Sequence, residues 1–113
     1  MHEMSITRNL IAVAEKAARD NGAEAVVGIR IGVGRYSGII PEYVVRCFDI
    51  LKPGTIAEEA SLSFEELPTR IRCRQCGVED EPDEATSGCR HCGASDVQMI
   101  SGFDAAIISI EAT

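Results

Sequence analysis

Residues 73–93 read Cys73-Arg-Gln-Cys76-Gly77, then a link from Val78 to Gly88, then Cys89-Arg-His-Cys92-Gly93. Two Cys-x-x-Cys pairs at this separation are a strong zinc-site signal, because two intervening residues let one tight turn aim both sulfurs at one ion. Four thiolates complete the closed tetrahedral shell of a structural zinc site. The sequence therefore predicts a structural Zn²⁺ site, whose four ligands are Cys73, Cys76, Cys89 and Cys92.

The two cysteine pairs also form a short internal repeat. A glycine follows each second cysteine, which permits a left-handed turn that lets backbone N–H groups point at sulfur. Iron in a rubredoxin-like site, disulfides and redox switching remain alternatives for the same residues. The link 78–88 is acidic and cannot build a core, so we expect this lobe to depend on bound metal for its order.

On either side of the lobe, apolar periodicity predicts two helices. Residues 4–21 have helical spacing and end at Asn21-Gly22, and a second helix starts near Pro41, which suits a first helical position. The expected core positions are Ile6, Leu10, Val13, Ala14 and Ala17 in the first helix and Val44, Val45, Phe48 and Leu51 in the second.

Alternating apolar residues predict three strands, over residues 25–33, 59–66 and 105–111. In the first strand, Val27, Ile29, Ile31 and Val33 should share the buried face. A two-stranded hairpin is marginal alone, so the last strand should return to the main sheet, which makes the cysteine segment an insertion.

The predicted fold class is α+β. It has a three-stranded antiparallel or mixed sheet with two helices on one face, plus an inserted four-cysteine zinc-ribbon lobe. The expected domains are residues 1–67 together with 101–113, and residues 68–100 as the inserted zinc-binding domain.

Charge and composition exclude several classes of protein. Eleven Lys and Arg residues stand against 18 Asp and Glu, for a formal net charge of −7, which argues against nucleic-acid binding. No apolar run is long enough to span a membrane, and the N-terminus does not read as a secretory signal. We expect a cytoplasmic protein, in which clustered cysteines indicate metal more than disulfides.

Cys47 and His91 are also of types that bind metals, but they lie outside the predicted set of zinc ligands. Cys47 stands alone on the second helix among apolar neighbours, so we expect a buried, inert thiol. His91 lies inside the second cysteine pair; it could replace a thiolate, although an exposed or supporting position is the simpler expectation.

The chain opens Met1-His2-Glu3-Met4-Ser5 ahead of the first helix. A free α-amine, the backbone nitrogen of His2 and its imidazole can chelate one metal in fused rings, and nitrogen-rich tetragonal sites suit Ni²⁺ and Cu²⁺. This opening resembles that of the HypA family, nickel-delivery proteins of [NiFe]-hydrogenase maturation. The resemblance extends over the whole chain, with family-like residues at Gly32-Val33-Gly34, Ser37-Gly38, Pro41-Glu42 and Phe48-Asp49, and with the double Cys-x-x-Cys.

The resemblance implies a division of labour between two metals. Nickel, the cargo, would be held by the Met1 amine, backbone nitrogens and the His2 side chain, with Glu3 nearby, while zinc would be structural. A HypB-type GTPase and the [NiFe]-hydrogenase large subunit or its maturation complex would be partners, and some relatives also serve urease. Some members carry an acidic residue after the first strand that assists nickel; here Ile40 stands there, and Glu42 is the nearest carboxylate.

The leading hypothesis is therefore a nickel metallochaperone, not an enzyme. The alternative from another class is a zinc-ribbon adaptor or interaction module without nickel delivery, and a third is a redox protein that uses the clustered cysteines. With two histidines, the chain shows no Ser/His/Asp set, and it has no G-x-x-x-x-G-K-[ST] phosphate loop.

Overall fold

The computed structural model describes residues 2–82 and 88–113, with only the backbone described at His2. Within this part of the chain, the elements are α1 (His2–Asp20), β1 (Val26–Gly34), α2 (Pro41–Leu51), β2 (Ser61–Leu67), β3 (Arg70–Cys73), β4 (Glu79–Asp80), β5 (Val97–Ser101) and β6 (Ala105–Ala112). The chain forms two compact units. The first comprises the residues up to Gly32, Ile39–Glu65 and Ala105–Thr113; the second comprises Val33–Gly38 and Glu66–Asp104.

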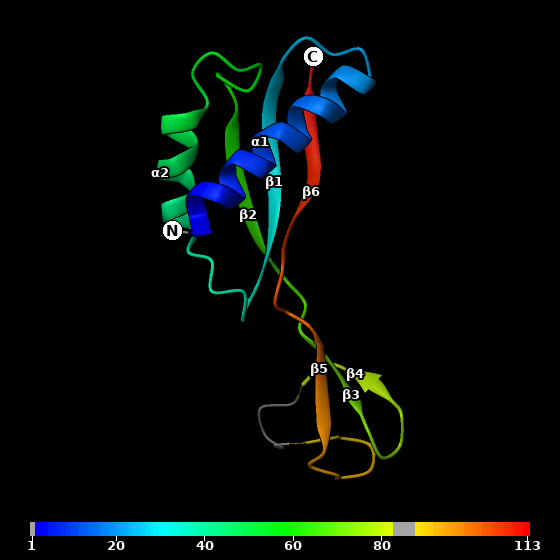
Figure 1. The fold of residues 1–113 in the computed structure, drawn as a ribbon. Helices are drawn as coiled ribbons and strands as arrows, with labels where there is room; N and C mark the ends of the chain where they lie inside the picture. The colour runs from blue at the N-terminus through cyan, green and yellow to red at the C-terminus, as the bar shows by residue number, and fades with distance from the viewer. Residues whose placement is uncertain (1, 83–87) are drawn as a thin grey trace. The chain divides into compact units, whose positions relative to one another are not determined.

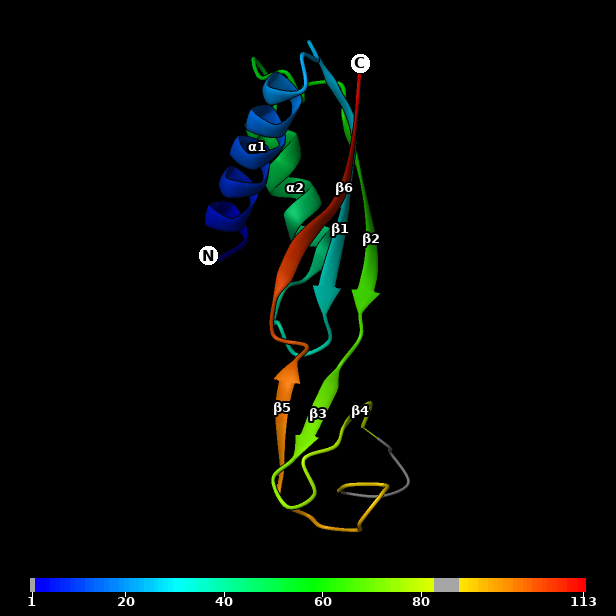
Figure 2. The same cartoon turned by 90° about the vertical axis from the view of Figure 1, so that its right-hand side faces the viewer.

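The first unit is built on a three-stranded sheet in the order β2-β1-β6. Figure 2 shows β1 and β2 running in the same direction and β6 running against them. The reciprocal bonds between Thr113 and Ala25, at 2.9 and 3.2 Å, join the end of β6 to the start of β1. The sheet is therefore mixed, and α2 connects its two parallel strands.

Both helices cover one face of this sheet (Figures 1 and 2). The predicted fold class is thus confirmed for the helix–sheet body, as is the return of the last strand to the main sheet. Large side chains that are almost fully buried between helices and sheet are Val26, Ile29, Ile31, Val44 and Phe48.

The buried stripe of α1 is rotated from the one that the sequence predicts. Leu10 and Ala14 are buried as expected, but Val13 is 45% exposed. Ile11 and Ala18 are buried instead, together with Thr7, whose hydroxyl donates to the Glu3 carbonyl at 2.6 Å. The prediction missed Thr7 because its hydroxyl is satisfied one turn back along the helix, so that a polar residue can face the core.

Helix α2 starts at Pro41, as predicted, because Pro has no N–H to lose at the first helical position. Val44 and Phe48 are buried one turn apart, whereas Val45 is 37% exposed and Leu51 is partly exposed. The prediction that Val45 belongs to the buried stripe is wrong: positions 44 and 48 point inward, and position 45 lies about 100° away around the helix.

Strand β1 buries Ile29 and Ile31, as predicted, but Val27 and Val33 only partly. Val26 is fully buried, although the alternation that puts Val27, Ile29, Ile31 and Val33 on the buried face would place Val26 on the opposite one. Its N–H donates to the carbonyl of Ile56 at 2.9 Å, so the segment after α2 contacts the start of the strand. Tertiary contact therefore overrides the simple alternation there.

The second unit contains another three-stranded sheet, in the order β4-β3-β5 with antiparallel pairing throughout. The sequence did not predict these strands, because they are only four, two and five residues long, which is too short for an apolar alternation to stand out. Among the described hydrophobic side chains of this unit, those that are buried are Ile71, Cys73 and Cys89. Such a small apolar core makes a metal ion a natural source of stability.

Candidate metal centres

The four predicted zinc ligands lie together in the second unit. The sulfurs of Cys73 and Cys92 are 3.5 Å apart, and those of Cys76 and Cys89 are 3.6 Å apart. All four sulfurs lie within 4.8 Å of one another. A tetrahedral Zn²⁺ with bonds of about 2.3 Å places its sulfurs about 3.8 Å apart. The cluster therefore fits one tetrahedral ion.

The internal repeat of the sequence is also a repeat of structure. Gly77 N–H donates to the Cys73 carbonyl, and Gly93 N–H to the Cys89 carbonyl, both at 2.9 Å. The two glycines have φ angles of 77° and 76°, a left-handed conformation that other residues rarely adopt. Each pair therefore closes through the same turn, which brings its two sulfurs to one side.

The electrostatics of the cluster favour a bound cation. The Cys76 backbone N–H lies 3.4 Å from the Cys73 sulfur and is the main cause that lowers the pKa of Cys73 to about 6. The Cys92 backbone N–H, followed by that of His91, lowers the pKa of Cys89. At Cys92 the Ala94 N–H favours the thiolate, but the Cys73 thiol and burial outweigh it and raise the pKa to about 12.

Protons are thus unevenly shared among the four sulfurs. The two buried members of the cluster, Cys73 and Cys89, hold thiolates most readily. A divalent ion supplies the positive charge that lets all four be thiolates at once, because a coordinating thiol is deprotonated by the metal. The donor set and the geometry both suit structural zinc.

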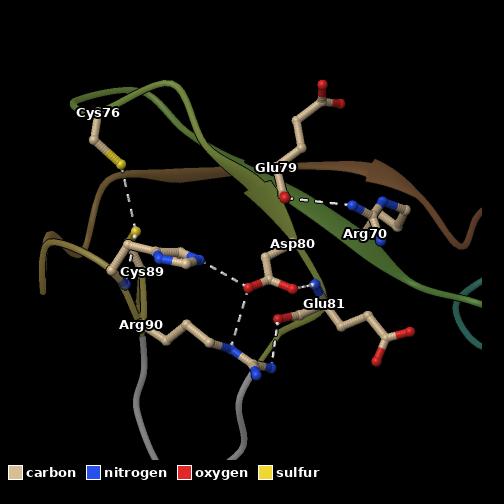
Figure 3. Close-up of polar contacts among 8 residues, drawn as sticks. Arg70, Cys76, Glu79, Asp80, Glu81, Cys89 and Arg90 are labelled. Atoms are coloured by element: carbon tan, nitrogen blue, oxygen red, sulfur yellow. Dashed lines mark hydrogen bonds and ion pairs between the residues drawn. The ribbon is translucent and has the colours of Figure 1, made fainter.

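His91 contacts a carboxylate on the neighbouring hairpin. Its Nε2 lies 3.0 Å from Oδ2 of Asp80, at the end of β4. The adjacent Arg90 reaches the same carboxylate (Figure 3). The sequence did not predict that Asp80 and Arg90 are partners, because their pairing spans most of the link between the cysteine pairs. The available signal was an acidic residue near the start of that link and a basic residue just after its end.

The structure describes only some of the predicted nickel ligands. Met1 and the side chain of His2 lie outside the described residues. Glu3 lies in the first turn of α1 and is partly buried. Ile40 occupies the position just before α2, and Glu42 is exposed in that helix's first turn.

A hollow of about 350 Å³ adjoins the first turn of α1, lined by Glu3, Met4, Tyr43, Arg46 and Cys47. Cys47 is only partly buried, so the prediction of a buried thiol is wrong. It lies one position before Phe48, which takes the inward-facing place on α2, so its own side chain reaches the helix edge and the hollow.

The fold and the cysteine cluster define a small α+β protein with an inserted zinc ribbon. Within the described residues, no helix is both long and apolar enough to cross a bilayer. Comparison with known proteins narrows the class. The family model described as "Hydrogenase/urease nickel incorporation, metallochaperone, hypA" matches residues 1–112. The chain belongs to the HypA family.

Relatives and solved structures agree with this assignment. The hydrogenase maturation factor HypA of Aquifex aeolicus is 38% identical over 111 residues, which cover 98% of this chain and 96% of the relative. That of Moorella thermoacetica is 37% identical over 102 residues, 90% of each chain. The solution structure of the Ni metallochaperone HypA from Helicobacter pylori matches the fold with a TM-score of 0.78 at 23% identity, covering 97% of this chain and 96% of that one.

The family assignment gives the chain its broad role. It is a nickel metallochaperone of hydrogenase maturation, and it works with the hydrogenase maturation machinery. Its four-cysteine cluster fits a structural zinc site.

Proposed function

We propose that this chain carries Ni²⁺ at its N-terminus and releases it for [NiFe]-hydrogenase maturation. The Met1 amine, backbone nitrogens and the His2 side chain are the proposed ligands, with Glu3 contributing nearby. The observation that carries the proposal is the opening Met1-His2-Glu3, at the head of a family match that begins at residue 1. Such a nitrogen-rich set suits Ni²⁺.

The position of α1 supports this use of the backbone. The helix begins at His2, and the first four N–H groups of an α-helix have no partner within the helix. The backbone nitrogen of His2 can therefore bind a metal without loss of a helical hydrogen bond. The partial positive charge at the N-terminus of the helix repels a bound cation, and the negative charge of the Glu3 carboxylate offsets this repulsion. A site balanced in this way can release its ion, as a carrier must.

The proposed partners follow from what the chain itself does not encode. The sequence has no phosphate-binding loop, so nucleotide hydrolysis would come from a HypB-type GTPase. The receiving protein would be the [NiFe]-hydrogenase large subunit or its maturation complex, in the cytoplasm. In this scheme residues 1–67 with 101–113 bind nickel, and residues 68–100 bind zinc.

A nickel titration of the zinc-loaded chain with a native, untagged N-terminus tests the proposal. We expect His2→Ala to lose most of its nickel affinity while it keeps its fold and zinc. His91→Ala is the matched control, because it removes the chain's other histidine, and it should bind nickel like the unmodified chain. Equal nickel affinity in His2→Ala would refute the ligand assignment. Absence of a specific nickel site in the unmodified chain would favour the zinc-ribbon adaptor.

A further inference from the structure

The two cysteine turns are attached to the second unit in different ways. Cys73 belongs to β3, the central strand, and its N–H donates to the Val78 carbonyl at 3.0 Å to close the hairpin with β4. The second turn precedes β5, and its bonds from Cys89 to Ala94 and from Gly93 to Cys89 stay within the turn itself. The second turn therefore lies outside the β3–β4 hairpin ladder.

Side chains join this second turn to the hairpin, and they converge on Asp80 (Figure 3). Its Oδ2 lies 3.0 Å from His91 Nε2 and 3.5 Å from Arg90 Nε. The Arg90 guanidinium also donates to the Glu81 carbonyl at 3.0 Å. Oδ1 of Asp80 accepts the Glu81 N–H at 2.8 Å, which fixes the orientation of the carboxylate. Apart from the sulfurs, these are the side-chain bonds between hairpin and turn among the described residues.

We propose that Asp80 is a positioning residue that clips the second cysteine turn onto the first hairpin and so sets the rate at which zinc leaves. Zinc is freed when its bonds to sulfur break, and movement of the second turn away from the first removes two of the four sulfurs, those of Cys89 and Cys92, at once. Arg90 and His91 lie between the two cysteines of the second turn, so the same movement must break their bonds to Asp80. The Glu81 N–H, and then His91, lower the pKa of the Asp80 carboxyl, which keeps the clip charged.

Zinc transfer from the zinc-loaded chain to an excess of a colorimetric chelator measures this rate. In Asp80→Asn, we expect release to be about fivefold faster, since partly exposed charge pairs contribute modestly. Glu81→Gln is the control, because it removes one adjacent negative charge while its backbone bonds remain. Figure 3 shows the Glu81 carboxylate turned away from the cluster, and we expect its release rate to be unchanged.

Two further readouts separate a clip from a general loss of structure. Co²⁺ loaded in place of zinc should give the same four-thiolate spectrum in Asp80→Asn as in the unmodified chain. Arg90→Ala with His91→Ala should speed zinc release, and adding Asp80→Asn to this pair should speed it no further. The proposal is overturned if Asp80→Asn releases zinc at the unmodified rate, if Glu81→Gln matches its effect, or if the Co²⁺ spectrum shows that a thiolate has been lost. It does not depend on the nickel site.

Discussion

At the scale of single residues, ligand chemistry separates the two metals of this chain. The zinc cluster consists of four sulfurs within 4.8 Å of one another. The proposed nickel site uses nitrogen from a terminal amine and an imidazole. Thiolates select zinc, whereas nitrogen in a tetragonal arrangement suits Ni²⁺. In the proposed arrangement, each metal therefore binds the donor set that it prefers.

Protons should compete with nickel near neutral pH. The α-amine has a reference pKa of about 7.7–8.0 and imidazole one of about 6.5, and both must be deprotonated to bind metal. Nickel affinity should therefore be full above pH 8 and fall as the pH is lowered through this range. Nickel titrations at several pH values between about 8 and 5.5 measure the change. An affinity that stays constant over that interval would show that other groups bind the ion.

Sequence reasoning succeeds for residues whose role is set locally. The spacing of Cys73 and Cys76 predicts their joint use, because one turn brings the two sulfurs together. Asp80 and His91 could not be paired in this way, since eleven positions separate them in the sequence and the fold alone brings them within 3.0 Å. Cys47 was misjudged because its exposure depends on which neighbour faces the core.

At the scale of elements, the end of β1 shows how a glycine permits close backbone approach. Gly34 N–H donates to the Asp104 carbonyl, and Tyr36 N–H to the Gly102 carbonyl, each at 2.8 Å. A Cβ added at Gly34 would lie only 2.4 Å from the Gly102 carbonyl oxygen. Because Gly34 has no Cβ, residues 33–38 can approach residues 102–104 closely enough to pair with them.

We predict that Gly34→Ala separates these two segments. The overlap is with backbone atoms, which cannot turn aside, so we expect a loss of about 1–3 kcal/mol in the stability of the second unit. Hydrogen exchange should show reduced protection of the Gly34-position and Tyr36 amides. Gly28→Ala, in the same strand, meets only the Glu111 side chain at 3.5 Å and should be tolerated. Retained protection of both amides in Gly34→Ala would contradict this explanation.

The elements that the sequence predicts well are the ones with long apolar periodicity. Both helices and the strands of the main sheet were predicted within a few residues, although the buried stripe of α1 was rotated toward Ile11 and Ala18. Strands β3, β4 and β5 were missed because backbone pairing and the cysteine turns define them. With two to five residues each, these strands are too short for an apolar alternation to predict them.

At the scale of the whole molecule, the chain combines a body with an apolar core and a unit with almost none. Val26, Ile29 and Phe48 are nearly fully buried in the first unit, whereas the second buries few apolar side chains beyond Ile71. We therefore expect the first unit to be stable through apolar burial and the second to depend on a bound metal. This contrast supports a structural role for a metal in the second unit.

The central claim is that two metals occupy two chemically distinct sites, and X-ray absorption at both metal edges tests it most directly. The sample is the untagged chain loaded with one equivalent each of zinc and nickel. We predict four sulfur neighbours around zinc at about 2.3 Å, and a nickel shell of nitrogen and oxygen without cysteine sulfur. A sulfur-rich nickel shell, with zinc displaced from Cys73, Cys76, Cys89 and Cys92, would contradict the account.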